Sequence, residues 1–241
     1  MSNEALIRRD LAVLWHPCTQ MHDHEALPPI PVRSAEGAWL EDFAGRRYLD
    51  AISSWWVNLF GHRHPRIVAA LEAQLRQLDH VLLAGFTHEP AVKLAESLLA
   101  VAPPGLARVF YGDNGSSAIE IALKMSFHYW RNQGQAGKRR FIALRGGYHG
   151  ETLGALGVTD VPLYRATYAP LLGDPIFVAS PDAYDAEPGE TTEQHALRRC
   201  AEMEAALARH AGECCAVIVE PLVQCAGNMR MHDPLYLKLL R

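Results

Sequence analysis

Short apolar runs alternate along the chain with longer segments in which apolar residues recur every three or four positions. The recurring segments predict amphipathic helices over residues 65–78, 89–100, 116–132 and 193–210. The short runs predict buried strands at residues 109–111, 140–144, 175–179 and 215–219. Because the strands lack polar alternation and are separated by helices, we expect an α/β protein with a largely parallel sheet.

The first 60 residues follow a different pattern. Residues 1–36 are polar and proline-rich after a short helix, which predicts an arm followed by a loop, and residues 38–43 and 47–51 predict a β-hairpin. Trp55 and Trp56 follow in a loop, and at least one of them is expected to pack against the protein. The apolar residues of the 89–100 helix, which include Val92, Leu94 and Leu98, are expected to be buried.

The turn Gly-Asp-Asn-Gly (residues 112–115) carries the first candidate chemistry. A strand that turns into a helix leaves backbone N–H groups unpaired, and the helix dipole adds partial positive charge there, so the turn suits a phosphate. Gly115 permits close approach of an anion, and the Ser116 hydroxyl can donate one more hydrogen bond. An ordinary capped helix is the alternative interpretation. The sequence is neither a P-loop nor a dinucleotide fingerprint.

Three stretches are expected at the carboxyl edge of the sheet, where parallel sheets bind ligands: residues 112–117, 146–151 and 220–227. Tyr148, held between glycines, could stack on a ring, and His149 could lie at the edge of that ring. A phosphate cradle beside an aromatic side chain suits a flat, phosphorylated cofactor. The alternative for Tyr148 is a half-buried loop aromatic.

Composition narrows the class of protein. With 241 residues, of which 49% are hydrophobic, the chain can bury a sizeable core. A net charge of −4 gives no basic surface for nucleic acid or an anionic membrane, and neither a signal peptide nor a membrane span is evident. Five cysteines without a Cys-x-x-Cys pair indicate a cytoplasmic, reducing setting. The His22/His24 and His62/His64 pairs are expected to be solvated loop residues, and no metal is expected.

Three motifs together resemble the class III, fold-type I aminotransferases, which use pyridoxal 5'-phosphate: Gly-Asp-Asn-Gly-Ser-Ser-Ala-Ile-Glu (112–120), Gly-Tyr-His-Gly (147–150) and Val-Ile-Val-Glu-Pro (217–221). Trp-His-Pro-Cys-Thr-Gln-Met (15–21) and Ser-Ser-Trp-Trp (53–56) are similar to one branch of that family. That branch moves an amino group from S-adenosyl-L-methionine to 8-amino-7-oxononanoate, giving 7,8-diaminononanoate in biotin biosynthesis. The resemblance extends from Trp15 to about Arg230.

The resemblance implies a cytoplasmic homodimer with active sites at the subunit interface. Residues 1–60 would be the arm and hairpin segment of the small domain, and residues 61–241 the first part of the large cofactor-binding domain. The implied cofactor-binding residues are Gly115, Ser116, Tyr148 and His149. The implied substrate-binding residues are Trp55, Trp56, Tyr148, Cys18 and Glu151. Some relatives carry Tyr at position 18 and Asp at position 151, and residues 224–228 depart from a more glycine-rich pattern.

The reaction needs a lysine that holds the cofactor as a Schiff base and a carboxylate paired with the pyridine nitrogen. In the family both follow the Glu-Pro motif, and none of Lys93, Lys124, Lys138 and Lys238 matches the lysine position. We therefore expect no catalytic residue within the chain, the lysine lying beyond Arg241, and expect these 241 residues alone to be inactive and prone to aggregate. Two alternatives stay open: a class III transaminase for an ω-amino acid, ornithine or a diamine, and a non-catalytic relative that binds a phosphate ligand or serves as a partner subunit.

Overall fold

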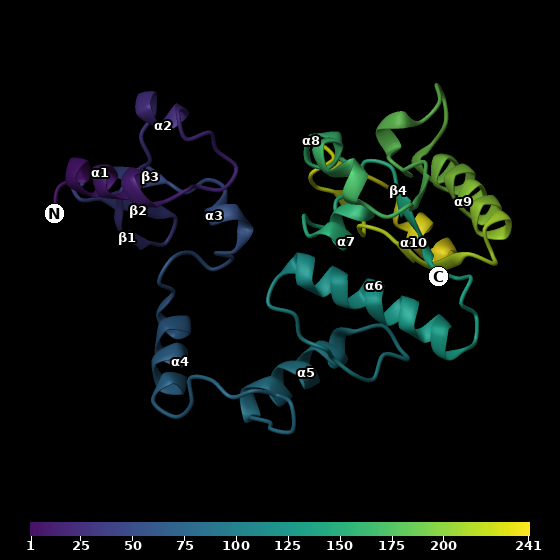
Figure 1. Cartoon of the computed structure of the whole chain (residues 1–241), viewed down its shortest axis with the longest axis horizontal. Coiled ribbons are helices and arrows are strands. Elements are labelled where there is room, and N and C mark those ends of the chain that lie inside the picture. The colour runs from purple at the N-terminus through teal and green to yellow at the C-terminus, as the bar shows by residue number, and fades with distance from the viewer. The chain divides into compact units, whose positions relative to one another are not determined.

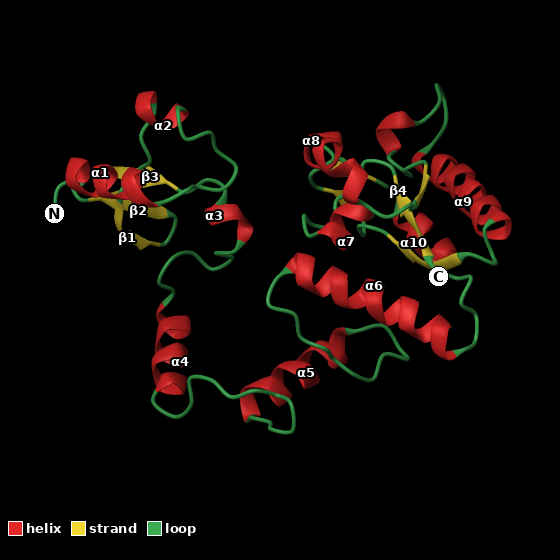
Figure 2. Ribbon diagram, in the orientation of Figure 1, coloured by secondary structure: helices red, strands yellow, loops and turns green.

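The computed structural model describes residues 1–241, which form two compact units, Met1–Pro104 and Gly105–Arg241. Each unit is built around its own sheet, and Figure 2 distinguishes the helices, strands and loops. None of the helices is both long enough and apolar enough to cross a membrane.

The first unit contains a three-stranded antiparallel sheet in the order β1-β2-β3. Its elements are α1 (Asn3–Val13), α2 (Asp23–Ala26), β1 (Val32–Glu36), β2 (Trp39–Asp42), β3 (Arg47–Leu49), α3 (Ser53–Trp56), α4 (Pro65–Leu75) and α5 (Glu89–Val101). The predicted hairpin is confirmed as β2 and β3. Strand β1 was missed, because it begins directly after a proline-rich stretch and lacks a distinct apolar pattern of its own.

The buried carboxylate of Asp42 links α1 to this sheet by hydrogen bonds. The Asp42 carboxylate accepts hydrogen bonds from Asn3 Nδ2 (2.9 Å), Arg46 Nε (3.0 Å) and the Tyr48 hydroxyl (3.0 Å). Burial acts to raise the pKa of Asp42, but the hydrogen bond from the Arg46 amide (2.9 Å) and these three from side chains outweigh it and hold that pKa well below its usual range. Asn3 Oδ1 also accepts from the Phe43 amide (3.0 Å), so α1 lies beside the strands (Figure 1).

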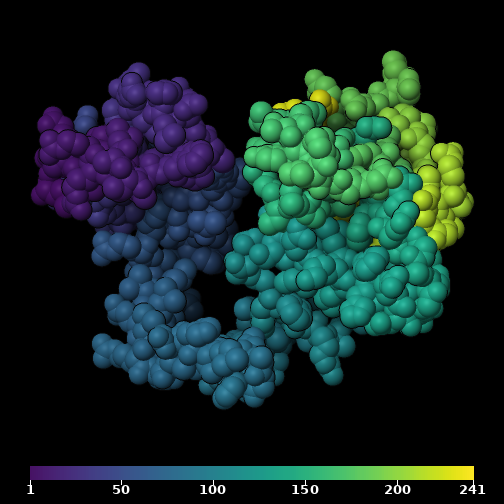
Figure 3. Space-filling model, in the orientation of Figure 1, coloured from purple at the N-terminus to yellow at the C-terminus, as the bar shows by residue number.

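Helices α4 and α5 form where the sequence predicts them, but the expectation that the apolar side chains of α5 are buried is wrong. Val92, Leu94 and Leu98 are exposed, and neither helix contains a buried residue. The reason is that neither helix packs extensively against another element of the first unit. Figure 3 shows α4 as a narrow blue segment whose own side chains form the surface.

The second unit contains a parallel sheet in the order β5-β4-β6, which confirms the predicted α/β class. Its elements are α6 (Gly115–Asn132), β4 (Arg140–Leu144), α7 (Leu153–Gly157), α8 (Pro162–Arg165), η1 (Ala166–Leu171), β5 (Ile176–Val178), η2 (Ala183–Asp185), α9 (Thr192–Arg209), β6 (Cys214–Ile218), β7 (Val223–Gln224), β8 (Arg230–Met231) and α10 (Pro234–Leu240).

The central strand β4 is covered on both faces, because successive side chains of a strand point to opposite sides. Ile142 and Leu144 belong to one apolar cluster with residues of α9 and α10, including Met203. Ala143 belongs to a second cluster with Leu123 of α6. Helices therefore cover the sheet on both sides, as the continuous apolar character of residues 140–144 predicts.

The predicted strand at residues 109–111 is not formed. A segment becomes a strand only when its backbone groups pair with a neighbouring strand. β4 is already paired on both sides with β5 and β6, and residues 109–111 pair with no strand. The segment runs without regular structure into the N-terminus of α6.

Candidate functional site

The N-terminus of α6 has two unpaired amides. The Asn114 side chain accepts a hydrogen bond from the Ser117 amide (2.9 Å), and the Asn114 carbonyl accepts from the Ala118 amide (3.0 Å). The amides of Gly115 and Ser116 have no acceptor within the chain. The 18-residue helix adds the positive end of its dipole at this point. Unpaired amides at the positive end of a helix dipole suit an anion, so this end of α6 stays the candidate phosphate site.

The loop that follows β4 lies directly against this helix end. The Glu151 amide donates a hydrogen bond to Ser116 Oγ (3.2 Å). Gly150 has a φ of +122°, and a Cβ there would overlap the Ser116 side chain. Only glycine permits this approach, so Gly150 fixes the loop against the first turn of α6.

The loop that follows β6 joins the same group through Glu220. One oxygen of its carboxylate accepts from the Tyr148 amide (2.8 Å) and the other from the Cys225 amide (3.1 Å). Burial raises the pKa of Glu220, against the two backbone hydrogen bonds. The three stretches expected at the carboxyl edge are thus linked by hydrogen bonds. The linking role of Glu220 was missed, although an acidic residue directly after a buried strand was the available signal.

Tyr148 and His149 face different surroundings. The half-buried Tyr148 donates its hydroxyl to Glu151 Oε1 (2.8 Å), and its ring lies 5.4 Å from the Tyr164 ring, centroid to centroid. His149 is only 8% exposed, its amide donates to Thr159 Oγ1 (3.0 Å), and its Nε2 has no hydrogen-bond partner. Burial lowers the pKa of His149 to about 4, so its ring is neutral at pH 7.

A cavity of about 510 Å³ lies at this edge of the sheet, lined by polar side chains that follow each of the three strands. Arg145 follows β4, Ser180 follows β5 and Gln224 follows β6. Gln224 links the other two, because its Nε2 donates to the Arg145 carbonyl (3.0 Å) and its Oε1 accepts from Ser180 Oγ (2.7 Å). Parallel sheets bind small ligands in such crevices beyond the strand ends.

The remaining candidate residues belong to the first unit. Trp55 and Trp56 are 57% and 71% exposed, so the expectation that one of them is packed is wrong. The reason is that α3 is a single surface turn, which no other element of that unit covers extensively. Cys18 is an exposed free thiol in a concave part of the arm, which Trp15 also lines.

The histidine, cysteine and lysine side chains that the sequence singles out have varied surroundings. No group of three or more His, Cys, Asp or Glu side chains is placed to hold a metal ion, and all five cysteine thiols are free. His22 is solvated as expected, but His62 is not, because its Nε2 lies 2.8 Å from Asp50 Oδ2. Lys93 pairs with Glu89 (2.8 Å), and Lys138 donates to the Ala211 carbonyl (2.7 Å).

Comparison with known proteins identifies the family. A model of the aminotransferase class-III family matches residues 20–241. The chain belongs to this family. The predicted family and fold class are thereby confirmed.

Several curated relatives carry the name adenosylmethionine-8-amino-7-oxononanoate aminotransferase. The protein from Helicobacter pylori is 46% identical over 238 residues, covering 98% of this chain and 52% of the relative. That from Synechococcus elongatus is 46% identical over 227 residues, covering 94% of this chain and 52% of the relative. The chain spans about half the length of the curated relatives it matches.

Solved structures of class-III transaminases have the same fold. The adenosylmethionine-8-amino-7-oxononanoate aminotransferase of Methanocaldococcus jannaschii aligns with a TM-score of 0.87 at 32% identity, covering 98% of this chain and 51% of that one. The omega transaminase of Pseudomonas jessenii in complex with PMP also aligns with a TM-score of 0.87, at 29% identity, covering 98% of this chain and 52% of that one.

Proposed function

We propose that the whole protein is a pyridoxal-phosphate-dependent aminotransferase that moves an amino group from S-adenosyl-L-methionine to 8-amino-7-oxononanoate, giving 7,8-diaminononanoate for biotin biosynthesis. The observation that carries this proposal is the 46% identity, along nearly the entire chain, to two relatives that bear the name of this enzyme. The unpaired amides at the start of α6 support the choice of a phosphorylated cofactor.

Two features of the second unit fit the phosphate of the cofactor. The free amides of Gly115 and Ser116 point out from the positive end of α6, and the Ser116 hydroxyl lies beside them. Tyr148 would stack on the pyridine ring, because Glu220 fixes its backbone and Glu151 fixes its hydroxyl. His149 would belong to the cofactor-binding residues and lie at the edge of the pyridine ring as a neutral imidazole. The bound cofactor supplies the electron sink for amino-group transfer.

The substrate-side assignments belong to the same proposal. Trp55 and Trp56 would line the substrate pocket, Cys18 would approach it from the arm, and Glu151 would border it together with Tyr148. Residues 1–60 are assigned to the small domain and residues 61–241 to the large domain of a cytoplasmic homodimer. The exposed state of both tryptophans in the first unit is compatible with this role, because side chains that contact a ligand cannot be buried in their own unit.

The donor preference of the full-length protein tests the reaction. We expect formation of 7,8-diaminononanoate with S-adenosyl-L-methionine as donor, measured by mass spectrometry. A preference for ornithine or 4-aminobutyrate would refute the assignment in favour of another class-III transaminase. That alternative is supported by the Pseudomonas jessenii structure, which aligns as well as the Methanocaldococcus jannaschii one.

Cofactor affinity tests the proposed phosphate site. Ser116→Ala should weaken binding of pyridoxal 5'-phosphate at least about tenfold, because a hydrogen bond to a charged group is worth roughly 1.5–3 kcal/mol. The matched control is Ser126→Ala on the same helix, whose hydroxyl donates to the Ala122 carbonyl (2.8 Å). Cofactor absorbance during titration provides the measurement. Equal affinities for the two variants would refute the assignment of Ser116.

A further inference from the structure

The turn that carries Trp55 and Trp56 has an unfavourable backbone conformation. All four residues of α3 have positive φ angles: 51° at Ser53, 47° at Ser54, 66° at Trp55 and 67° at Trp56. Residues with side chains rarely adopt the left-handed region, and then as single residues rather than in succession. The conformation of this turn therefore depends on contacts from outside it.

Asp50 supplies contacts that fix the turn. Its Oδ1 accepts a hydrogen bond from the Ser54 amide (2.8 Å), and its Oδ2 accepts from the Ser54 hydroxyl (2.7 Å). The Asp50 side chain is only 7% exposed. The hydrogen bonds from Ser54, with a further one from His62, lower the pKa of Asp50, so that it stays a charged acceptor at neutral pH.

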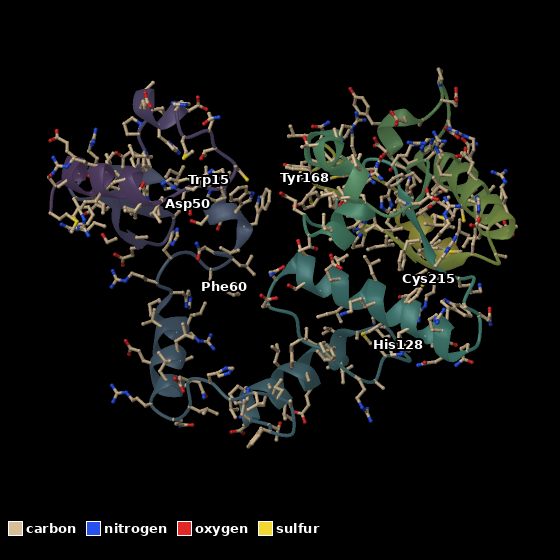
Figure 4. The ribbon with its side chains drawn as sticks, in the orientation of Figure 1. Trp15, Asp50, Phe60, His128, Tyr168 and Cys215 are labelled. Carbon is tan, nitrogen blue, oxygen red and sulfur yellow. The ribbon has the colours of Figure 1, made fainter.

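Asp50 is itself anchored to the sheet. His62 Nε2 lies 2.8 Å from Asp50 Oδ2, and the His62 backbone pairs in both directions with Gly37, at the turn between β1 and β2 (3.0 and 2.8 Å). The Asp50 amide donates to the Ala38 carbonyl (2.9 Å). Figure 4 labels Asp50, which directly follows β3 and precedes α3. A continuous set of hydrogen bonds thus runs from the sheet to the turn.

The tryptophan rings contribute little to holding this turn, because both are largely exposed. We propose that Asp50, held by His62, is a positioning residue that fixes the Ser53–Trp56 turn so that Trp55 and Trp56 are presented to the substrate. This inference rests on the proposed function, in which both tryptophans line the substrate pocket. Asp50 acts through the turn and makes no contact with substrate in this role.

Hydrogen–deuterium exchange of the full-length protein tests the structural part without depending on activity. Asp50→Asn keeps the size of the side chain but loses the charge and one acceptor, so amides of residues 53–58 should exchange about tenfold faster. Ser54→Ala, which leaves the Asp50–His62 pair intact, should accelerate the same amides to a smaller extent. The matched control is Glu41→Gln in β2, whose partner is Arg33 at the surface. Unchanged exchange in Asp50→Asn would overturn the proposal.

A double-mutant cycle tests the link to substrate. Asp50→Asn should raise the KM for at least one substrate about tenfold while kcat changes by less than about threefold. In a Trp55→Phe, Trp56→Phe background the same substitution should raise KM less than about twofold, because coupled residues act non-additively. Equal effects in both backgrounds would show a general loss of structure and overturn the positioning role. Wild-type protein without activity on the substrate pair would instead refute the proposed function, while the exchange measurement would still decide whether Asp50 holds the turn.

Discussion

Replacing Gly150 by alanine should separate the α6 N-terminus from the loop after β4. A Cβ at this position would lie 2.9 Å from the Ser116 Cβ and 3.0 Å from the Ser116 Cα. Because the Cα is part of the backbone, no side-chain rotation relieves the overlap. The added methyl group must therefore displace the first turn of α6 or the loop that carries Tyr148.

The expected loss of stability in Gly150→Ala has two parts. The φ of +122° is unfavourable for alanine, at a cost of about 1–3 kcal/mol. Overpacking typically adds about 1–3 kcal/mol. Gly189→Ala separates the two parts, because Gly189 also has a positive φ (+84°) but has no atom within 4 Å of an added Cβ. Gly150→Ala should therefore be less stable than Gly189→Ala by at least about 1–3 kcal/mol, because it adds the packing part and its φ lies further from the left-handed region.

Urea unfolding of the full-length protein and titration with pyridoxal 5'-phosphate measure the two consequences. Gly150→Ala should lower both the free energy of unfolding and the affinity for the cofactor, because Ser116 is displaced. Gly189→Ala should lower only the free energy of unfolding. The same loss of stability in both variants, together with unchanged cofactor affinity, would refute the contact between Gly150 and Ser116 and with it the proposed phosphate site.

Three further predictions address one buried side chain, His149, and two partly buried ones, Asn3 and Glu120. His149 has a pKa of about 4 when folded and about 6.5 when unfolded, so between these pH values the unfolded chain binds a proton that the folded chain does not. The free energy of unfolding should therefore fall as pH decreases through 6.5 towards 4, by about 2 kcal/mol at pH 5. Urea unfolding at pH 8 and pH 5 should show that His149→Phe lacks this loss of stability, while the exposed His128→Gln retains it. The same loss of stability in both variants would contradict the lowered pKa of His149. Asn3→Ala removes hydrogen bonds to Asp42 and Phe43 and should destabilise the protein by about 1–2 kcal/mol, with faster amide exchange in α1; unchanged exchange would contradict this anchor. Glu120→Gln weakens the acceptor for the Thr152 hydroxyl and two amides of α7, so it should cost about 1–2 kcal/mol at pH 7 by urea unfolding. Those hydrogen bonds outweigh burial and lower the pKa of Glu120, so the difference from wild type should shrink in acid, as the pH falls through that lowered pKa; a pH-independent difference would contradict this.

The sequence predicted the central strand of the sheet and the start of α6 because their signals are local. Residues 140–144 are continuously apolar, and Asn114 precedes a helical pattern, so strand and helix start could be assigned without tertiary information. Segments that depend on a distant partner were less predictable. Residues 109–111 have strand-forming side chains but no strand to pair with, and β1 pairs with β2 despite its weak pattern.

Side-chain roles within the site were predictable only in part. The turn motif points to Gly115 and Ser116 as candidates. The position of Glu220 directly after a buried strand marks it as a candidate too, but the sequence does not show that it accepts a hydrogen bond from the Tyr148 amide, 72 positions away. His149 illustrates the same limit, because it is buried while the adjacent Tyr148 is only half-buried, a difference that the packing of the loop determines. Asp50 likewise acquires its partners from Ser54 and His62 through the geometry of the turn.

The attachment of Asn3 to Asp42 has a practical consequence for protein production. The Ser2 hydroxyl accepts from the Ala5 amide (3.2 Å) and caps α1, and the next residue is already tied to the sheet. An affinity tag joined directly to Met1 would therefore begin two residues from a buried junction. A flexible glycine–serine spacer ahead of Met1 would let the tag bind a resin without disturbing the hydrogen bonds between Asn3 and the hairpin.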